Sequence, residues 1–311
     1  MPVDTPVEAR GLVKRYGPIT AVDHVDLTVE RGDVYGFLGP NGAGKTTTLR
    51  ILLGLIRPDD GEARLFGRDP QHELPEALDG VAGFVETPYF YPYLSGRKNL
   101  ELLAAFDRDS GRERIDRLLE LVDLTKRADD RVRGYSQGMR QRLGVAASLL
   151  RDPRLLLLDE PTNGLDPGGM RDMRRLVVRL SGEGITVLLS SHLLAEVEEI
   201  CNRVAIIRAG WIAYEGTLAE LRASAGSNRY RLLTTDDARV GQILLEHPEA
   251  REVILGGDEL TFSATEEEAA QISRALVGAG LGITALVPEQ LSLESFFFEL
   301  TEGEEPAEAA A

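Results

Sequence analysis

The stretch that decides the fold is Gly39-Pro40-Asn41-Gly42-Ala43-Gly44-Lys45-Thr46. It fits the pattern Gly-x-x-x-x-Gly-Lys-Ser/Thr, in which the backbone N–H groups of a glycine-rich turn surround phosphate oxygens. The apolar run 34–38 before it predicts a buried strand, and the run 45–55 after it predicts a helix. A helix N-terminus attracts anions, Lys45 would reach the β- and γ-phosphates, and the Thr46 hydroxyl would bind Mg²⁺. The stretch therefore predicts a nucleotide-binding loop.

A second apolar run, residues 155–158, consists of four leucines and ends in the carboxylates Asp159 and Glu160. Such a run predicts a central parallel strand that is covered on both faces. In enzymes with a glycine-rich loop, an acidic residue here holds Mg²⁺, which is the role expected of Asp159. Glu160 follows at the mouth of the strand, where a carboxylate can orient or deprotonate the attacking water. Alone, the pattern also fits a buried strand with a solvated acidic turn.

Strands alternate with helices along residues 1–222, which predicts an α/β domain with a mainly parallel sheet. The small-residue stretch 223–227 predicts a linker. Beyond it, the order strand, helix, strand, strand, helix, strand predicts a small α+β domain of ferredoxin-like pattern, within residues 223–301. The acidic, alanine-rich tail 302–311 is expected to be disordered.

Composition excludes several classes of protein. The 311 residues include 35 Lys and Arg against 51 Asp and Glu, and the net charge of −16 repels phosphate backbones. We therefore expect no nucleic-acid partner. Cys201 is the only cysteine, so an internal disulfide is impossible and a reducing compartment fits. No run approaches the roughly 18 apolar residues that span a bilayer, and residues 1–10 lack a signal segment, so any membrane role would be peripheral.

Three further motifs resemble those of ATP-binding cassette (ABC) ATPases, and the resemblance covers residues 6–220. Tyr-Ser-Gln-Gly-Met-Arg-Gln-Arg at 135–142 resembles the signature motif of that family, Leu-Ser-Gly-Gly-Gln. Pro-Thr-Asn-Gly-Leu-Asp at 161–166 resembles its D-loop, and Ser-Ser-His at 190–192 resembles its H-loop. Together with the glycine-rich loop and the acidic strand, these motifs identify the chain as similar to that family.

The resemblance implies both a fold and an assembly. The fold would be a P-loop NTPase ABC cassette with a mainly parallel sheet core, an antiparallel β-subdomain and a helical subdomain. In this family two cassettes pair head to tail, and each ATP lies between the glycine-rich loop of one and the signature of the other. A second copy of the chain, ATP and Mg²⁺ are therefore expected partners.

The signature departs from the family pattern at two positions, because Gln137 and Met139 replace the usual glycine and glutamine. Ser136 and Gly138 match. The family implies that the Ser136 hydroxyl and the Gly138 N–H donate hydrogen bonds to the γ-phosphate across the dimer. The dipole of the helix that follows would favour the same negative charge.

Two side chains acquire roles only from these motifs. The resemblance places His192 at the γ-phosphate and the attacking water, and Tyr16 on the adenine ring. A lone histidine after a strand, or a tyrosine at a strand end, is otherwise more often structural. The expected site then comprises catalytic Lys45, Glu160 and His192; nucleotide-binding Tyr16, Gly39, Pro40, Asn41, Gly42, Ala43, Gly44, Lys45, Thr46, Thr47, Glu86, Ser136, Gly138 and Asp166; and metal-binding Thr46, Glu86 and Asp159.

Residues 83–88 occupy the place of the family's Q-loop, which supplies a glutamine to Mg²⁺ and faces the membrane partner. Here the residue is Glu86, and segment 86–95 is similar to ATPase subunits of bacitracin-resistance and lantibiotic-immunity exporters. Segment 292–301 resembles the closing segment of these and of daunorubicin-type exporters. A carboxylate beside a triphosphate needs a compensating cation, either Mg²⁺ or a basic side chain of the permease. A solvated loop acid is the alternative.

The leading hypothesis is an ATP-hydrolysing subunit at the cytoplasmic face of the membrane. It would power export of a drug, peptide antibiotic or lipid-like compound through a separate transmembrane permease. ABC ATPases of chromosome maintenance carry long coiled coils before the signature, whereas Ser136 lies only 91 residues after Lys45. Ribosome-associated members usually join two cassettes. A nucleotide-binding scaffold without turnover is disfavoured by Asp159, Glu160 and His192.

Overall fold

The computed structural model describes residues 5–106, 111–225, 229–256, 259–289, 293 and 297–298. The chain divides into two compact units, Met1–Leu218 and Ala219–Ala311. The division falls at helix α8 (Leu218–Ala225), whose last residues belong to the stretch predicted as a linker. The boundary expected after residue 222 stays a prediction, and the tail 302–311 lies outside the described residues.

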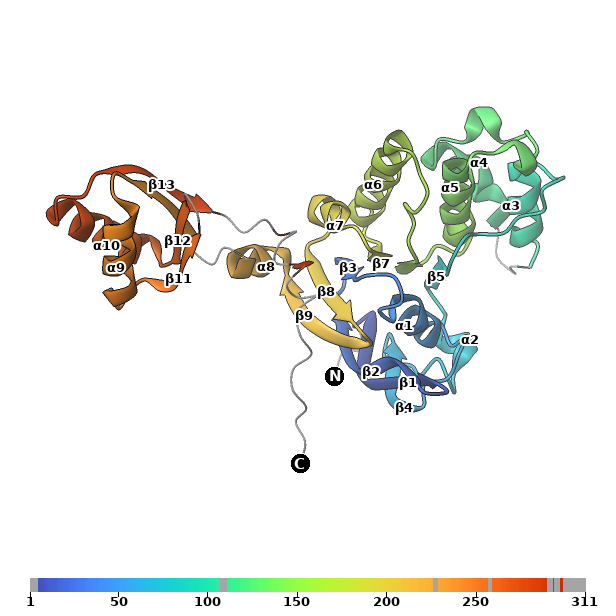
Figure 1. Ribbon diagram of the computed structural model, residues 1–311. Coiled ribbons are helices and arrows are strands. Elements are labelled where there is room, and N and C mark those ends of the chain that lie inside the picture. Colours follow the sequence, from blue (N-terminus) through green and yellow to red (C-terminus); the bar gives the residue numbers. More distant parts are fainter. Residues whose placement is uncertain are drawn as a thin grey trace. The chain divides into compact units, whose positions relative to one another are not determined.

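A six-stranded sheet organises the first unit, with the order β5-β6-β7-β3-β8-β9 (Figure 1). Five strands are parallel, and β9 runs antiparallel to β8. Their bounds are Val81–Phe84 (β5), Leu155–Leu158 (β6), Thr186–Ser191 (β7), Val34–Leu38 (β3), Arg203–Arg208 (β8) and Trp211–Thr217 (β9). Because β6, β7 and β3 are parallel neighbours, their carboxyl ends lie at the same edge of the sheet. The glycine-rich loop, Asp159 and His192, which directly follow these strands, therefore lie at that edge.

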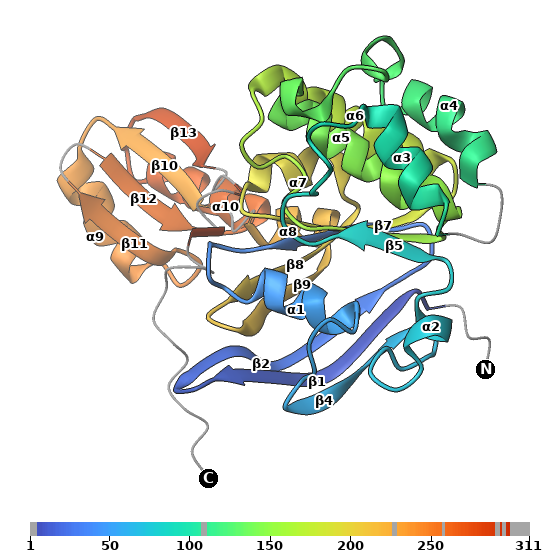
Figure 2. The same cartoon turned by 90° about the vertical axis from the view of Figure 1, so that its right-hand side faces the viewer.

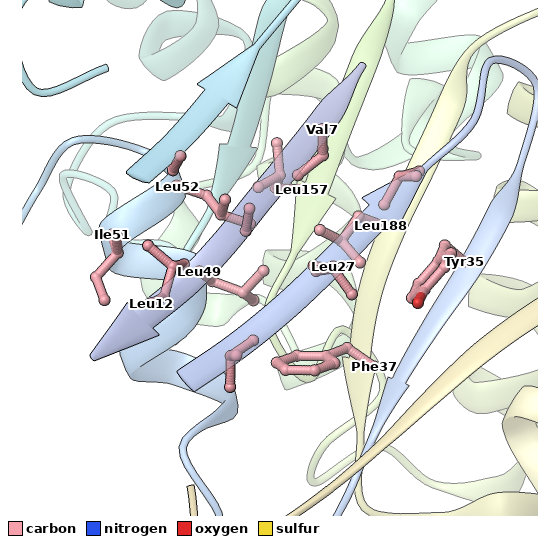
Figure 3. Packing of buried hydrophobic residues seen from close by; sticks show 14 of the residues in the cluster. Val7, Leu12, Leu27, Tyr35, Phe37, Leu49, Ile51, Leu52, Leu157 and Leu188 are labelled. Carbon is pink, nitrogen blue, oxygen red and sulfur yellow. The ribbon is translucent and has the colours of Figure 1, made fainter. Parts of the chain in front are cut away.

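An antiparallel sheet of order β2-β1-β4 forms a second layer, and α1 (Lys45–Leu52) lies between the two sheets (Figure 2). Its strands are Val7–Tyr16 (β1), Ile19–Val29 (β2) and Asp60–Leu65 (β4). The buried core joins Leu49 and Leu52 of α1 to Leu12 of β1, Phe37 of β3 and Leu157 of β6 (Figure 3). The helix was expected to continue to residue 55 but ends at Leu52, since Gly54 adopts a positive φ of 67°.

Helices gather on the other face of the six-stranded sheet (Figure 2). Asp166 caps the N-terminus of α6 by accepting a hydrogen bond from Gly169 N, and Pro167 occupies the first helical position. These cap signals explain why α6 begins at Pro167. These helices are Gly96–Ala104 (α3), Gly111–Leu121 (α4), Gln137–Ser148 (α5), Pro167–Gly182 (α6) and Leu194–Ile200 (α7), whereas the short helix Leu74–Ala77 (α2) lies beside β1 and β4.

The second unit contains a four-stranded antiparallel sheet of order β11-β12-β10-β13 and two helices. The element order strand, helix, strand, strand, helix, strand is the one predicted from the sequence. Its elements are Arg229–Thr234 (β10), Asp237–Glu246 (α9), Arg251–Gly256 (β11), Glu259–Ser263 (β12), Glu266–Gly278 (α10) and Ile283–Glu289 (β13). In neither unit does the described part of the chain contain a helix with the length and hydropathy of a membrane span.

Candidate nucleotide-binding site

A polar cleft of about 350 Å³ opens beside the glycine-rich loop. Gly44 begins α1 with a φ of 110°, and a side chain there would meet Ala21 O at 2.4 Å, so the close turn into the helix requires glycine. The cleft is lined from the loop and α1, from the ends of β5 and β6, and from the signature and D-loop segments. The lining residues are Ala21, Asn41, Gly42, Gly44, Lys45, Thr46, Thr47, Glu86, Thr87, Gln137, Gln141, Asp159, Glu160 and Asn163.

The ammonium group of Lys45 lies over the loop that precedes it. Its Nζ donates hydrogen bonds to Gly39 O at 2.6 Å and Pro40 O at 3.1 Å, and lies 3.2 Å from Glu160 Oε1. The side chain is buried, and the first turn of α1 carries no acidic residue. A buried cation and the positive end of a helix dipole together form a local anion site within a strongly acidic chain.

Asp159 and Thr46 offer hard oxygen ligands at the edge of this cleft. Thr46 Oγ1 donates to Asp159 Oδ2 at 2.9 Å, and Glu86 N donates to the same carboxylate oxygen at 3.3 Å. Among the residues that the structure describes, no group of three or more His, Cys, Asp or Glu could hold a metal ion. This donor set fits Mg²⁺, which binds one or two protein oxygens together with nucleotide phosphates and water.

Glu160 lies between the two other residues expected to be catalytic. Its Oε2 forms a hydrogen bond of 2.7 Å with His192 Nδ1, and its Oε1 faces Lys45 Nζ. The backbone of Glu160 has a φ of 48°, a conformation that few residues other than glycine adopt. The structure thus brings together a carboxylate, an imidazole and an ammonium group, which is a suitable arrangement for activating water beside a phosphate.

Glu86 has a cationic partner that the sequence analysis did not consider. Its carboxylate forms an ion pair with Arg50 in the last turn of α1, while its side chain remains 61% exposed. Its φ of 65° bends the chain after β5, and this turn directs the Glu86 N–H towards Asp159. Mg²⁺ and the permease are therefore not the sole candidates for neutralising this carboxylate.

Eight expected residues are not among the described residues that line the cleft of their own chain: Tyr16, Gly39, Pro40, Ala43, Ser136, Gly138, Asp166 and His192. Tyr16 ends β1 and is 45% exposed. Ser136 and Asp166 are the exposed N-caps of α5 and α6. Instead, Gln137 reaches the cleft, and its Nε2 donates to Asn163 O at 2.8 Å. Gln137, which departs from the signature pattern, therefore binds the D-loop.

Sequence reasoning missed a buried cluster of hydroxyl and carboxyl groups behind the site. Thr162 Oγ1 and Ser191 Oγ donate to Glu196 Oε2 at 2.7 and 2.9 Å, and Glu196 is only 3% exposed. Ser190, on the neighbouring position of β7, donates to Asp159. The available signal was a pair of serines that follows the apolar run 187–189 of β7. These contacts join the turn after Glu160 to the turn at His192.

Comparison with known proteins agrees with this geometry. Residues 22–163 match the family described as ABC transporter, and residues 216–301 match the C-terminal domain of DrrA1-3-like ATP-binding proteins. The bacitracin transport ATP-binding protein BcrA of Bacillus licheniformis is 37% identical, over 97% of this chain and 99% of its own length. The daunorubicin resistance ATP-binding protein DrrA3 of Streptomyces coeruleorubidus is 36% identical, over 99% of each chain. A solved ATP-binding subunit of an ABC transporter is 29% identical with a TM-score of 0.64, covering 71% of this chain and 94% of that one. The chain therefore belongs to the family of ABC transporter ATP-binding subunits.

Proposed function

We propose that this chain is the ATPase subunit that powers export of a drug, peptide antibiotic or lipid-like compound through a separate permease. The observation that carries the proposal is the single cleft in which Lys45, Thr46, Asp159 and Glu160 meet. The transport class rests on full-length similarity to relatives named for bacitracin transport and daunorubicin resistance. The chain acts at the cytoplasmic face of the membrane, where ATP is available.

Each residue of the cleft has a distinct chemical task. The N–H groups of the loop and the Lys45 ammonium bind the β- and γ-phosphates. Thr46 and Asp159 hold Mg²⁺, which when bound neutralises charge on those phosphates. Glu160 accepts the proton of the attacking water, and His192 holds the Glu160 carboxylate in position through the 2.7 Å hydrogen bond.

A second copy of the chain supplies the remaining contacts to ATP. Ser136, Gly138 and Asp166 lie at the N-termini of α5 and α6, away from the lining of their own cleft. In a head-to-tail pair, the positive end of the 12-residue helix α5 faces the γ-phosphate of the partner. A dimeric bacterial ABC transporter cassette of known structure is 26% identical with a TM-score of 0.61, covering 68% of this chain and 98% of that one. This relative supports the assembly.

The permease docks on an apolar groove directly after Glu86. A cavity of about 450 Å³ is lined by Phe84, Pro88, Tyr89, Leu103 and Phe106, among others. Tyr89 and Phe106 are 93% and 84% exposed, which is unusual for large apolar side chains unless a partner covers them. An apolar segment of the permease fits this groove, and its position next to Glu86 connects the partner with the ATP cleft.

Replacing Leu103 by glutamate is expected to abolish association with the permease while ATP hydrolysis by the isolated subunit is kept. Leu103 is 42% exposed on α3, and it lines both this groove and a neighbouring cavity of about 290 Å³. A charge there must be desolvated when the partner binds. Leu55→Glu, at an exposed leucine outside the groove, is the matched control. Co-purification of the tagged permease measures the effect, and unchanged recovery with Leu103→Glu contradicts the docking surface.

Export itself is tested with the permease that co-purifies with this chain, and the complex is reconstituted in inside-out vesicles. ATP-driven accumulation of an anthracycline, a cyclic peptide antibiotic or a fluorescent lipid identifies the class of cargo. Vesicles that carry the assembled complex and hydrolyse ATP, yet accumulate none of these three classes, contradict the export proposal. The ATPase measurement on the same vesicles keeps failure of transport distinct from failure of hydrolysis.

Glu86→Gln is expected to leave a substantial ATPase activity in the isolated subunit and to reduce export more strongly. Glutamine keeps a neutral oxygen that can bind the metal, but it removes the charge that pairs with Arg50 or with a basic group of the permease. Arg50→Gln is the matched variant. Equal defects in both variants assign the charge to the internal ion pair, whereas a defect confined to Glu86→Gln assigns it to the partner.

Two outcomes contradict this role of Glu86. If export and ATPase activity are both unchanged, Glu86 is only a solvated acidic residue of the loop, since exposed ion pairs contribute little free energy. Abolished ATPase in the isolated subunit shows that the charge is required for the chemistry itself. Both activities are therefore measured on the same preparation.

A further inference from the structure

Ser190 connects the two acidic residues of the site through one hydroxyl group. It lies at the second-last position of β7, in the strand next to β6, and its side chain is fully buried. Its Oγ donates to Asp159 Oδ1 at 2.6 Å and accepts from Glu160 N at 2.8 Å. The following residue, Ser191, donates to Glu196 instead. Of these two serines, Ser190 is therefore the one that contacts both Asp159 and Glu160.

The hydrogen bond to Asp159 fixes which carboxylate oxygen faces the cleft. Oδ1 is bound by Ser190, whereas Oδ2 accepts from Thr46 Oγ1 and from Glu86 N. Because Ser190 on the neighbouring strand β7 holds Oδ1 of Asp159, the other oxygen, Oδ2, stays directed towards Thr46. Hydrogen bonds of this kind orient metal-binding carboxylates and commonly change metal affinity or activity by about 10–100-fold.

The hydrogen bond from Glu160 supports an unfavourable backbone conformation. Glu160 has a φ of 48°, and its N–H would lack this buried acceptor if the hydroxyl were removed. The same backbone turn places the Glu160 carboxylate against His192 Nδ1 and Lys45 Nζ. One hydroxyl group therefore fixes both the metal-binding carboxylate and the residue that activates water.

We propose that Ser190 is a positioning residue for ATP hydrolysis, which orients Asp159 towards Mg²⁺ and holds Glu160 in its strained turn. This inference rests on the proposed roles of Asp159 and Glu160. Ser190 is not among the described residues that line the cleft, so its removal should spare metal-free ATP binding and weaken the steps that depend on Mg²⁺. A purely structural serine would lower the melting temperature without changing the dependence on Mg²⁺.

The test uses the full chain with Ser190→Ala. Calorimetry with a non-hydrolysable ATP analogue is expected to give wild-type affinity in EDTA, and about tenfold loss of the affinity measured with Mg²⁺. The Mg²⁺ concentration for half-maximal ATPase should rise about tenfold, and kcat should fall by about 10–100-fold. Ser148→Ala is the matched control, because its hydroxyl binds Gly144 O at 3.0 Å on α5, outside the cleft.

Asp159→Asn distinguishes the proposed role of Ser190 from the proposed role of Asp159. If it changes the Mg²⁺ dependence and Ser190→Ala does not, the inference about Ser190 is wrong. If neither variant changes it, the proposed role of Asp159 fails first. Should the alanine variant not fold, Ser190→Cys keeps the size with a weaker donor, and a Mg²⁺ dependence equal to wild type then overturns the proposal.

Discussion

Replacing Glu160 by glutamine is expected to stop ATP turnover while ATP remains bound. The amide keeps the size of the side chain and can still hydrogen-bond with His192 Nδ1, but it cannot accept a proton from water. Loss of a general base commonly costs about 10²–10⁴-fold in rate. The glycine-rich loop and Lys45 are unchanged, so the groups expected to bind the phosphates remain in place.

Hydrolysis that stops after binding should trap the ATP-bound pair of subunits. We therefore expect the Glu160→Gln variant to elute as a dimer with Mg-ATP and as a monomer without it. Glu183→Gln is the matched control, since the Glu183 side chain forms an exposed ion pair with Arg179 at 3.5 Å, outside the cleft. Phosphate release and size-exclusion chromatography measure both effects. Near wild-type hydrolysis by Glu160→Gln would refute its assignment as the base.

Local sequence patterns were sufficient wherever a short segment determines its own structure. The strands at 34–38 and 155–158 were predicted with the observed bounds, because each is an unbroken apolar run between turn residues. Both strands are parallel neighbours of β7, so their carboxyl ends lie at the same edge of the sheet. This topology by itself brings the glycine-rich loop close to Asp159 and Glu160. The positions of Lys45 and Asp159 therefore follow from the topology alone.

Contacts between distant segments could not be predicted in this way. Arg50 and Glu86 are 36 residues apart, and Ser190 lies 31 residues from Asp159. Neither pair has a spacing that any single helix or strand imposes, so only the assembled sheet brings them together. Gln137 is a similar case: it counted as a departure from the signature, yet its side chain holds the D-loop at Asn163. The sequence motifs located the site, whereas the tertiary packing determined how its groups are oriented.

Lys45→Ala is expected to abolish nucleotide binding at concentrations where the wild-type chain is saturated. The chain carries a net charge of −16, and Lys45 is the buried cation that the structure places at the loop. Charge-assisted hydrogen bonds contribute about 1.5–3 kcal/mol each, so the loss of contacts to two phosphates corresponds to at least a hundredfold weaker affinity.

The removal of Lys45 also leaves Glu160 without its counter-charge at 3.2 Å, so a carboxylate would then face the γ-phosphate unopposed. Repulsion between these groups adds to the lost attraction, and this distinguishes Lys45 from a lysine that merely contributes net charge. Lys98→Ala tests that distinction, because Lys98 forms an exposed ion pair with Glu101 and should bind ATP as the wild type does. The double variant Lys45→Ala/Glu160→Gln should regain part of the affinity, since it removes the repelling carboxylate charge. Calorimetry on all three variants gives the result, and tight ATP binding by Lys45→Ala alone is incompatible with a phosphate-binding role for this residue.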